Sequence, residues 1–554
     1  MKLFVIAIGG TGMRCLESFV HLCAIGMFDN QEIHILTLDT DQSNGNLGRV
    51  KELIQIYNKV KSEKENPVDG GHANVDTFFS AKLIPYEFCT DYSDQTRNTY
   101  KQLSHLAQDK DNARQNEDLS ALFMDAGSVQ QFALEYGYRA QTHLGSLLMY
   151  HGIVEAARHA SENGDAATMH EKSLKSFVEH LQQNQDEARV FVFGSVFGGT
   201  GASSIPVIPK ALEHAAQICL NGQTLDTSKA KFGSTLLTNY FTFNAPDSVQ
   251  KGKDKVVADS NNFALNSQAA LQFYQGDPTV QRTYKRFYHI GWPSGKRIDV
   301  SNKGNETLVG GQSQRNACHV AELMCACAAY DFFTLADDQL TNEVSQYLYR
   351  SAKSVDDVFS FSGADFVANG ELFENKLGAF FSLAHIILTT CDAAWSDKPT
   401  DGIRRLLNRF EQQNINDYKG CFSPNQSTDL DNYMKKFAYS FKDEEIEKGW
   451  IYQVYDSIQP GKFIFQPDAF ISQKALMKRI SAGRLFDDPR HNWSALSGLL
   501  AKADNSFDIL VRNMTEDRTR PDVNRQKLSN AKEKFLAHIY NAITQSQKFN
   551  LQSK

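Results

Sequence analysis

Two runs of apolar residues in this chain each end in a cluster of glycines, and this pattern limits the folds open to it. The first run, LFVIAI at 3–8, leads into Gly9, Gly10, Thr11 and Gly12; the second, ARVFVFGSV at 188–196, leads through Phe197 into Gly198, Gly199, Thr200 and Gly201. Continuous apolar strands of this kind are typical of a parallel sheet that helices cover on both faces. The two runs therefore predict an α/β fold built on a Rossmann-type parallel sheet.

Further strands and helices are expected along the chain. An apolar run at 33–38 ends in Asp39, and strands are expected again at 234–243 and 286–292. Apolar residues at three- and four-residue steps predict a long central helix at 312–334, after which the pattern is mostly helical. The resulting division is an α/β domain at 1–311, the central helix at 312–334 and a mostly helical C-terminal region at 335–554.

The glycine clusters have a chemical use as well as a steric one. Without Cβ atoms, their backbone N–H groups approach phosphate oxygens closely, and the N-terminus of the following helix adds a favourable dipole. Two such loops on parallel strands meet at the carboxyl edge of the sheet, where open α/β folds bind ligands. The P-loop pattern GxxxxGK[ST] and the dinucleotide fingerprint GxGxxG are both absent from the sequence. We therefore expect a phosphate-bearing ligand that is held by glycine loops of another kind.

Composition narrows the function classes. The chain has 554 residues and a formal net charge of −7, which argues against a general nucleic-acid binder. No stretch approaches the ~20 apolar residues that a membrane-spanning helix needs. The nine cysteines are scattered and include no CxxC pair, which suits a reducing compartment. We expect a cytoplasmic protein without a membrane span.

Three segments carry a resemblance to the tubulin/FtsZ superfamily. FGGTGASSIPVIP at 197–209 resembles the signature loop of that family, written GGGTGSG in tubulins and GGGTGTGAAPVIA in FtsZ, although Phe197 replaces its first glycine and Ser203 its last. VIAIGGTGMRCLESF at 5–19 resembles the family's first loop, and LTLDTDQSNG at 36–45 resembles its second. The chain looks most like the divergent bacterial tubulin-like proteins of this superfamily.

The resemblance implies a ligand and a set of residues that hold it. The ligand would be GTP or GDP with Mg²⁺, and ATP is not excluded. GYRA at 137–140 resembles the stretch after the family's third loop, which would put that loop near Gly127 and Ser128. The implied phosphate-side residues are Gly9, Gly10, Thr11, Gly12, Asp39, Thr40, Asp41, Gly127, Ser128, Gly198, Gly199, Thr200, Gly201, Ala202 and Ser203.

Two of the implied roles have simpler alternatives. Asp41 is the expected magnesium ligand, since carboxylate oxygens suit a hard cation, whereas Asp39 at a strand end is equally explained as a cap. Asn316 matches the asparagine that in the family hydrogen-bonds the guanine edge early in the central helix. An asparagine at a helix start also bonds local backbone, and the residues alone leave both roles open.

Catalysis and assembly follow the family less closely. In FtsZ, an NxDxxD loop after the central helix completes the active site of a neighbouring subunit. The corresponding window here, FFTLADDQLTNEV, keeps Asp337 and Asp338 but not the asparagine or the spacing, and a solvated helix end explains them equally. The resemblance implies head-to-tail self-assembly into an oligomer or filament, with slow or absent hydrolysis and at most a weak GTPase.

Two other functions stay open at this point. One is a non-polymerising, nucleotide-gated switch or scaffold that contacts a protein partner through residues 340–554. The other is a dinucleotide-dependent α/β enzyme, for which the sequence offers no catalytic triad or Cys–His motif.

Overall fold

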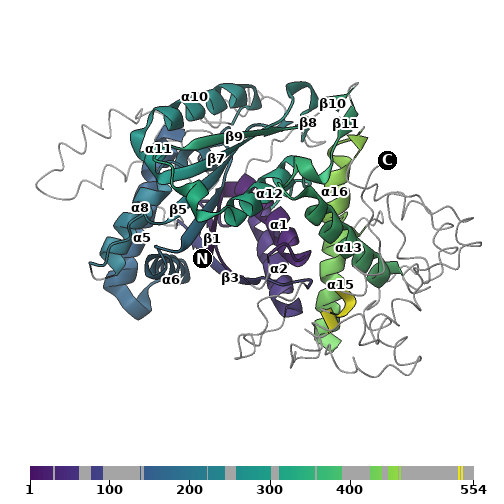
Figure 1. The fold of residues 1–554 in the computed structure, drawn as a ribbon. Coiled ribbons are helices and arrows are strands. Elements are labelled where there is room, and N and C mark those ends of the chain that lie inside the picture. The colour runs from purple at the N-terminus through teal and green to yellow at the C-terminus, as the bar shows by residue number, and fades with distance from the viewer. Residues whose placement is uncertain are drawn as a thin grey trace, which may run out of the picture.

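A computed structural model gives the fold of the chain (Figure 1). It describes residues 1–28, 31–61, 77–90, 138, 142–220, 222–243, 258–300, 311–352, 354–355, 358–389, 424–439, 447–459, 461–462, 535–536 and 538–540. Gly127 and Ser128, which were expected in a third loop, lie outside the described residues.

The centre of the fold is a seven-stranded parallel sheet. Its order is β3-β2-β1-β4-β5-β7-β9. The strands are β1 (Lys2–Ile8), β2 (Glu32–Asp39), β3 (Lys82–Cys89), β4 (Ala188–Phe193), β5 (Lys231–Leu237), β7 (Tyr284–Gly291) and β9 (Gln346–Ser351). The chain builds outward from β1 to β3 and then returns to place β4 on the other side of β1. This reversal between β1 and β4 is the point at which open α/β sheets bind ligands.

Helices cover both faces of the sheet, as the continuous apolar strands predicted (Figure 1). Leu3, Val5 and Ala7 of β1 face one core, and Phe4, Ile6 and Ile8 face the other. The first core contains α1 (Gly9–Ala24), α2 (Gly45–Val60), α12 (Val320–Thr334), α13 (Gly370–Thr389), α15 (Pro424–Ala438) and α16 (Trp450–Asp456). The second contains α5 (Thr142–Asn163), α6 (Met169–Gln183), α8 (Ile208–Cys219), α10 (Phe263–Gly276) and α11 (Pro278–Thr283).

The central helix is shorter than the expected 312–334, because α12 begins only at Val320. His319 is its N-cap: the ring accepts a hydrogen bond from the Ala321 amide, and Glu322 accepts one from the His319 amide. This reciprocal capping box fixes the start of the helix. Every residue from Val320 to Phe333 is buried, so α12 runs through the core of the molecule. The residues before His319 form a separate segment.

Beyond α12 the chain is not entirely helical. β9 extends the main sheet by a seventh strand at residues where we expected the helical C-terminal region. Also beyond α12, β10 (Ser354–Val355), β11 (Val358–Ser360) and β12 (Gly461–Lys462) form a small three-stranded sheet. A second small sheet, before α12, pairs β6 (Phe241–Thr242) with β8 (Ile298–Asp299). Among the described residues, no helix combines the length and apolar character that a membrane crossing needs.

Candidate functional site

The two glycine loops lie side by side at the carboxyl end of the central strands. α1 begins at Gly9 directly after β1, and the five-residue helix α7 (Thr200–Ser204) follows β4. A Cβ atom added to Gly9 would lie 3.1 Å from the Cβ of Thr200. Gly9 also has φ +64°, a left-handed conformation that favours glycine. The neighbouring strands β1 and β4 thus bring two distant parts of the chain together.

Some of the glycines are required by packing alone. A Cβ on Gly12 would come 2.7 Å from the carbonyl oxygen of Phe193, and one on Gly201 would come 2.8 Å from the backbone nitrogen and oxygen of Ser195. Ala202 and Ser203 are likewise buried, and the Ser203 hydroxyl donates to the Thr200 carbonyl at 3.0 Å. These four residues shape the loops from beneath.

The partly exposed residues of the loops are the ones a ligand can reach. Gly10 and Thr11 in the first loop, and Gly198, Gly199 and Thr200 in the second, are half-buried. The backbone N–H groups of Gly10 and Thr11 lie at the start of α1, and the first turn of α1 contains no acidic residue. A helix N-terminus without a nearby carboxylate favours a bound anion.

The acidic turn after β2 has a free carboxylate oxygen at Asp39. Oδ1 of Asp39 accepts hydrogen bonds from the amides of Thr40 at 2.8 Å and Asp41 at 3.3 Å. Oδ2 of Asp39 and the hydroxyl of Thr40 are buried and have no hydrogen-bond partner among the described residues. Burial, and next the nearby carboxylate of Asp41, raise the pKa of Asp39 to about 7. Asp39 therefore caps the end of β2 through Oδ1 and keeps Oδ2 without a hydrogen-bond partner among the described residues.

Asp41, the expected magnesium ligand, already has partners on both oxygens. Oδ1 accepts from the Ser43 amide at 3.0 Å and from its hydroxyl at 2.8 Å, and Oδ2 accepts from the Gly311 amide. No group of three His, Cys, Asp or Glu side chains in the described part of the chain is arranged to hold a metal ion. Magnesium bound with a nucleotide takes most of its ligands from phosphates and water, so one free carboxylate fits it. The free oxygen belongs to Asp39.

A segment before α12 borders the first glycine loop. The Gln314 Oε1 atom accepts a hydrogen bond from Asn44 Nδ2 at 2.8 Å, and both atoms lie within 3.4 Å of the position that a Cβ on Gly10 would occupy. The same segment packs tightly on α2, where a Cβ on Gly45 would come 2.4 Å from the Gln312 carbonyl oxygen. We call residues 311–319 the site segment.

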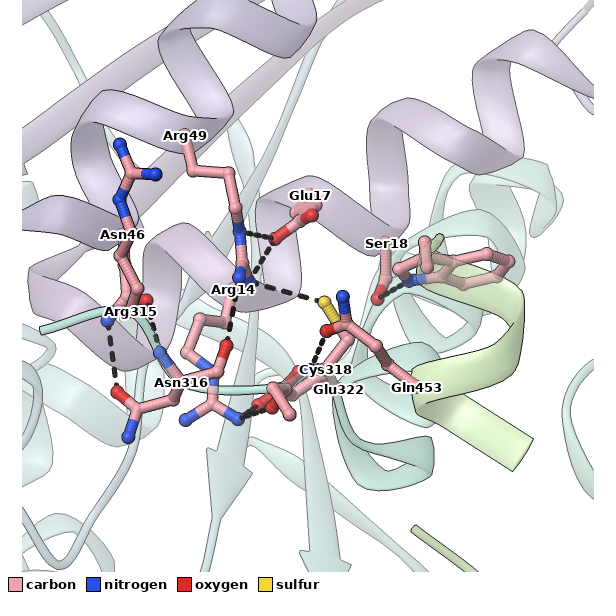
Figure 2. Close-up of polar contacts among 12 residues, drawn as sticks. Arg14, Glu17, Ser18, Asn46, Arg49, Arg315, Asn316, Cys318, Glu322 and Gln453 are labelled. Atoms are coloured by element: carbon pink, nitrogen blue, oxygen red, sulfur yellow. Dashed lines mark hydrogen bonds and ion pairs between the residues drawn. The ribbon is translucent and has the colours of Figure 1, made fainter. Parts of the chain in front are cut away.

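Asn316 lies in the site segment rather than in α12. The backbone amide of Asn316 donates to Asn46 Oδ1 at 3.2 Å, and the side-chain Oδ1 of Asn316 accepts from Asn46 Nδ2 at 3.3 Å (Figure 2). The placement of Asn316 at the start of a helix was wrong, because the capping box at His319 starts α12 three residues later. The side chain is half-buried and pairs with Asn46 of α2, and among the described residues it makes no hydrogen bond to local backbone.

Buried charges that the sequence did not reveal support this segment (Figure 2). Arg49 of α2 pairs with Glu17 of α1 at 2.6 Å and donates to the Asn316 carbonyl at 2.9 Å. Arg14 of α1 pairs with Glu322 of α12 and donates to the Ala317 carbonyl at 2.6 Å. Because each pair joins residues far apart in the chain, no local sequence signal identifies the partners.

Asp337 and Asp338 lie at the opposite end of the sheet. Asp337 accepts a hydrogen bond from Arg189 at 2.9 Å, and the Lys231 ammonium is 3.8 Å away. Arg189 and Lys231 are at the amino ends of β4 and β5, whereas the glycine loops follow the carboxyl ends. The hydrogen bond from Arg189 lowers the pKa of Asp337. Within one chain, these carboxylates therefore do not meet the glycine loops.

The structure thus gathers the two glycine loops, the turn at Asp39–Asp41 and Asn316 at one edge of the sheet, and leaves Asp337 and Asp338 at the other. Comparison of the chain with protein-family models, curated proteins and solved structures finds no match.

Proposed function

We propose that this protein binds a nucleoside di- or triphosphate at the carboxyl end of its sheet, in the manner of the tubulin/FtsZ superfamily. The observation that carries the proposal is the contact between Gly9 and Thr200, which joins two glycine loops at the point where the strand order reverses. A single glycine loop is explained by a tight turn. Two adjacent loops with half-buried backbone form a surface suited to more than one phosphate group.

Each part of the nucleotide has a candidate partner. The half-buried backbone of the two loops would hold the phosphates, with α1 directing its N-terminus toward them. Oδ2 of Asp39 would hold Mg²⁺ in place of the expected Asp41, because Asp39, unlike Asp41, keeps a carboxylate oxygen without a hydrogen-bond partner among the described residues. Asn316, and the carboxamides of Asn46 and Gln314 beside it, both donate and accept hydrogen bonds as a guanine edge requires.

The placement of Asp337 favours assembly over catalysis within one chain. The glycine loops and the Asp337–Asp338 window lie at opposite ends of the parallel strands. A head-to-tail contact would bring the window of one subunit to the loops of the next, and such a contact continues into a filament unless it closes. The Arg189 ion pair occupies Asp337, which supports slow hydrolysis.

One observation favours the second candidate, a nucleotide-gated switch. Gln453 of α16, in the C-terminal half of the chain, accepts a hydrogen bond from the Cys318 amide of the site segment, and Ser457, directly after α16, accepts one from the amide of Val320. A ligand that orders this segment would thereby change the conformation of the C-terminal half, and no self-assembly would be needed. The two candidates share the nucleotide site and differ in whether larger species form.

Titration of the purified protein with fluorescent analogues of GTP, ATP and NAD tests the proposal. We expect saturable binding of GTP with Mg²⁺ at micromolar concentrations or tighter, and weaker binding of NAD. Tight binding of NAD alone would replace the proposal with a dinucleotide enzyme. Absence of binding for all three analogues would exclude a nucleotide site.

A further inference from the structure

The site segment depends on a helix from the far C-terminal half of the chain. Oε1 of Gln453 in α16 accepts a hydrogen bond from the Cys318 amide at 2.7 Å (Figure 2). Two residues on, the amide of Val320 donates to the hydroxyl of Ser457 at 3.0 Å. Cys318 and Val320 are both buried, so water does not replace these acceptors.

The need for these acceptors follows from where α12 begins. The first amides of a helix have no partner inside it, and the amides just before it lack one as well unless a strand or turn supplies it. His319 and Glu322 satisfy the amides of Ala321 and His319 within the capping box. Cys318 and Val320, on either side of His319, use α16 and its C-terminal end instead.

α16 is tied to the nucleotide loops by a second route. The indole Nε1 of Trp450 donates to the hydroxyl of Ser18 at 3.0 Å, and Ser18 lies in α1, the helix that starts at Gly9. The Arg49 guanidinium contacts both the Asn316 carbonyl and the sulfur of Cys318. One continuous set of polar contacts therefore joins α1, α2, the site segment and α16 (Figure 2).

We propose that Gln453 is a positioning residue for the nucleotide site: it holds Cys318 so that Asn316, two residues earlier, faces the base. The proposal rests on the nucleotide-binding function proposed above. By thermodynamic reciprocity, a helix that changes the affinity for a ligand is itself stabilised when the ligand binds. α16 then reports the state of the site to the C-terminal half.

The test compares Gln453→Ala with Gln459→Ala in the full chain, using fluorescent GTP and ATP. Gln459 follows α16 by three residues, and its side-chain Nε2 donates to the Tyr455 carbonyl at 3.2 Å, a contact that does not involve the site segment. We expect Gln453→Ala to weaken GTP binding about tenfold and ATP binding less, so that the GTP:ATP preference falls, while Gln459→Ala leaves both affinities unchanged. Gln453→Glu keeps the acceptor for the Cys318 amide but loses the hydrogen bond from Gln453 Nε2 to the Lys448 carbonyl, so it should restore part of the GTP affinity.

A double-mutant cycle separates positioning from a loss of stability. If Gln453 acts through Asn316, the variant with both Asn316→Ala and Gln453→Ala should bind GTP about as weakly as the worse single variant. Independent, additive losses would overturn the proposal, as would equal weakening of GTP and ATP or a Gln453→Ala variant that behaves like Gln459→Ala. Absence of nucleotide binding by the wild type would overturn it together with the proposed function, whereas normal wild-type binding with any of these results overturns it alone.

Hydrogen exchange provides a readout at α16 itself. GTP should slow exchange of the amides at 450–457 in the wild type and in Gln459→Ala, and this protection should be lost in Gln453→Ala at saturating GTP. Equal protection of 450–457 in all three proteins would show that α16 does not sense the site through Gln453.

Discussion

Gly9 and Thr200 touch across the central strands: a Cβ on Gly9 would lie 3.1 Å from the Cβ of Thr200. Gly9 is the first residue of α1 and Thr200 the first of α7, so the contact joins two strand-to-helix turns. β1 and β4 are in register up to Ala7 and Phe193, which sets the two turns at the same height. An anion bound by one loop is therefore within reach of the other.

A carboxylate in the second loop should abolish nucleotide binding. Gly199 is half-buried at the start of α7, so Gly199→Asp places a negative charge where the phosphates would lie. Like charges brought together in this way cost several kcal/mol, and we expect affinity for GTP to fall at least about 100-fold. Gly295→Asp adds the same charge at an exposed glycine with no neighbour within 4 Å of its Cβ position, and it should bind normally. Unchanged affinity in Gly199→Asp, with a native circular dichroism spectrum, would remove this loop from the site.

Two glycines of α2 should respond in opposite ways to the same substitution. A Cβ on Gly45 would come 2.4 Å from the Gln312 carbonyl oxygen, whereas one on Gly48 would meet nothing within 4 Å. We expect Gly45→Ala to lower the free energy of unfolding by about 1–3 kcal/mol through overpacking. Gly48→Ala should raise it by up to about 1 kcal/mol, because alanine is the better helix former. Urea unfolding measures both; a stable Gly45→Ala would mean that the site segment does not pack on α2.

The titration of Asp39 should make stability depend on pH. Its carboxyl ionises near pH 3.8 in an unfolded chain and near pH 7 in the folded protein. Between these values the folded state binds more protons, so the free energy of unfolding falls as pH rises through this window. Asp39→Asn keeps the acceptor for the Thr40 and Asp41 amides without ionising. It should therefore flatten the fall, by on the order of 2–4 kcal/mol between pH 4 and pH 8.

Urea unfolding at several pH values compares the wild type with this variant. Asp186→Asn, at an exposed carboxylate paired with Lys229, serves as the control and should keep the wild-type profile. Parallel profiles for the wild type and Asp39→Asn would show that Asp39 is ionised in the folded protein at neutral pH.

Loss of the Asn316 carboxamide should weaken GTP more than ATP. Removing a protein side chain that hydrogen-bonds a base typically costs ~1–3 kcal/mol of binding free energy, which is about 5- to 150-fold in affinity. Asn261→Ala removes an exposed carboxamide elsewhere and should leave both affinities unchanged. Equal weakening for the two nucleotides in Asn316→Ala would assign Asn316 to the support of α2 through Asn46 rather than to the base.

The sequence predicted the sheet better than the site segment, for physical reasons. LFVIAI and VFVF are buried on both faces of the sheet, and this burial produces the continuous apolar runs that identified them. The start of α12 was missed because the apolar spacing continues upstream of His319. In the structure, the capping box at His319 starts the helix, and the pairing of Asn316 with Asn46 keeps the preceding residues out of it. β9 was missed because its residues are largely exposed and its apolar run, YLY at 347–349, is only three residues long.

The two strand-to-helix turns at the glycine clusters were predictable because a strand, a glycine cluster and a helix are consecutive in the chain. The contacts of Arg49 and Gln453 were not, since they depend on residues that only the fold brings together. The sequence did not show that Ser43 and Gly311 hydrogen-bond the oxygens of Asp41, or that Oδ2 of Asp39 has no partner among the described residues.

If subunits stack head-to-tail, the Asp337–Asp338 window of one completes the site of the next. Phosphate release should then rise more steeply than linearly with protein concentration, and sedimentation or electron microscopy should show larger species with GTP. Variants of the two carboxylates distinguish an effect on catalysis from an effect on structure. Asp337 is paired with Arg189 and Lys231, whereas Asp338 pairs with neither of them among the described residues. Asp338→Ala should slow turnover without weakening GTP binding to the monomer. Asp337→Ala should in addition release the buried Arg189 and change the contact itself. Release that stays proportional to concentration, from a protein that remains monomeric at tens of micromolar, would exclude assembly and leave the nucleotide-gated switch.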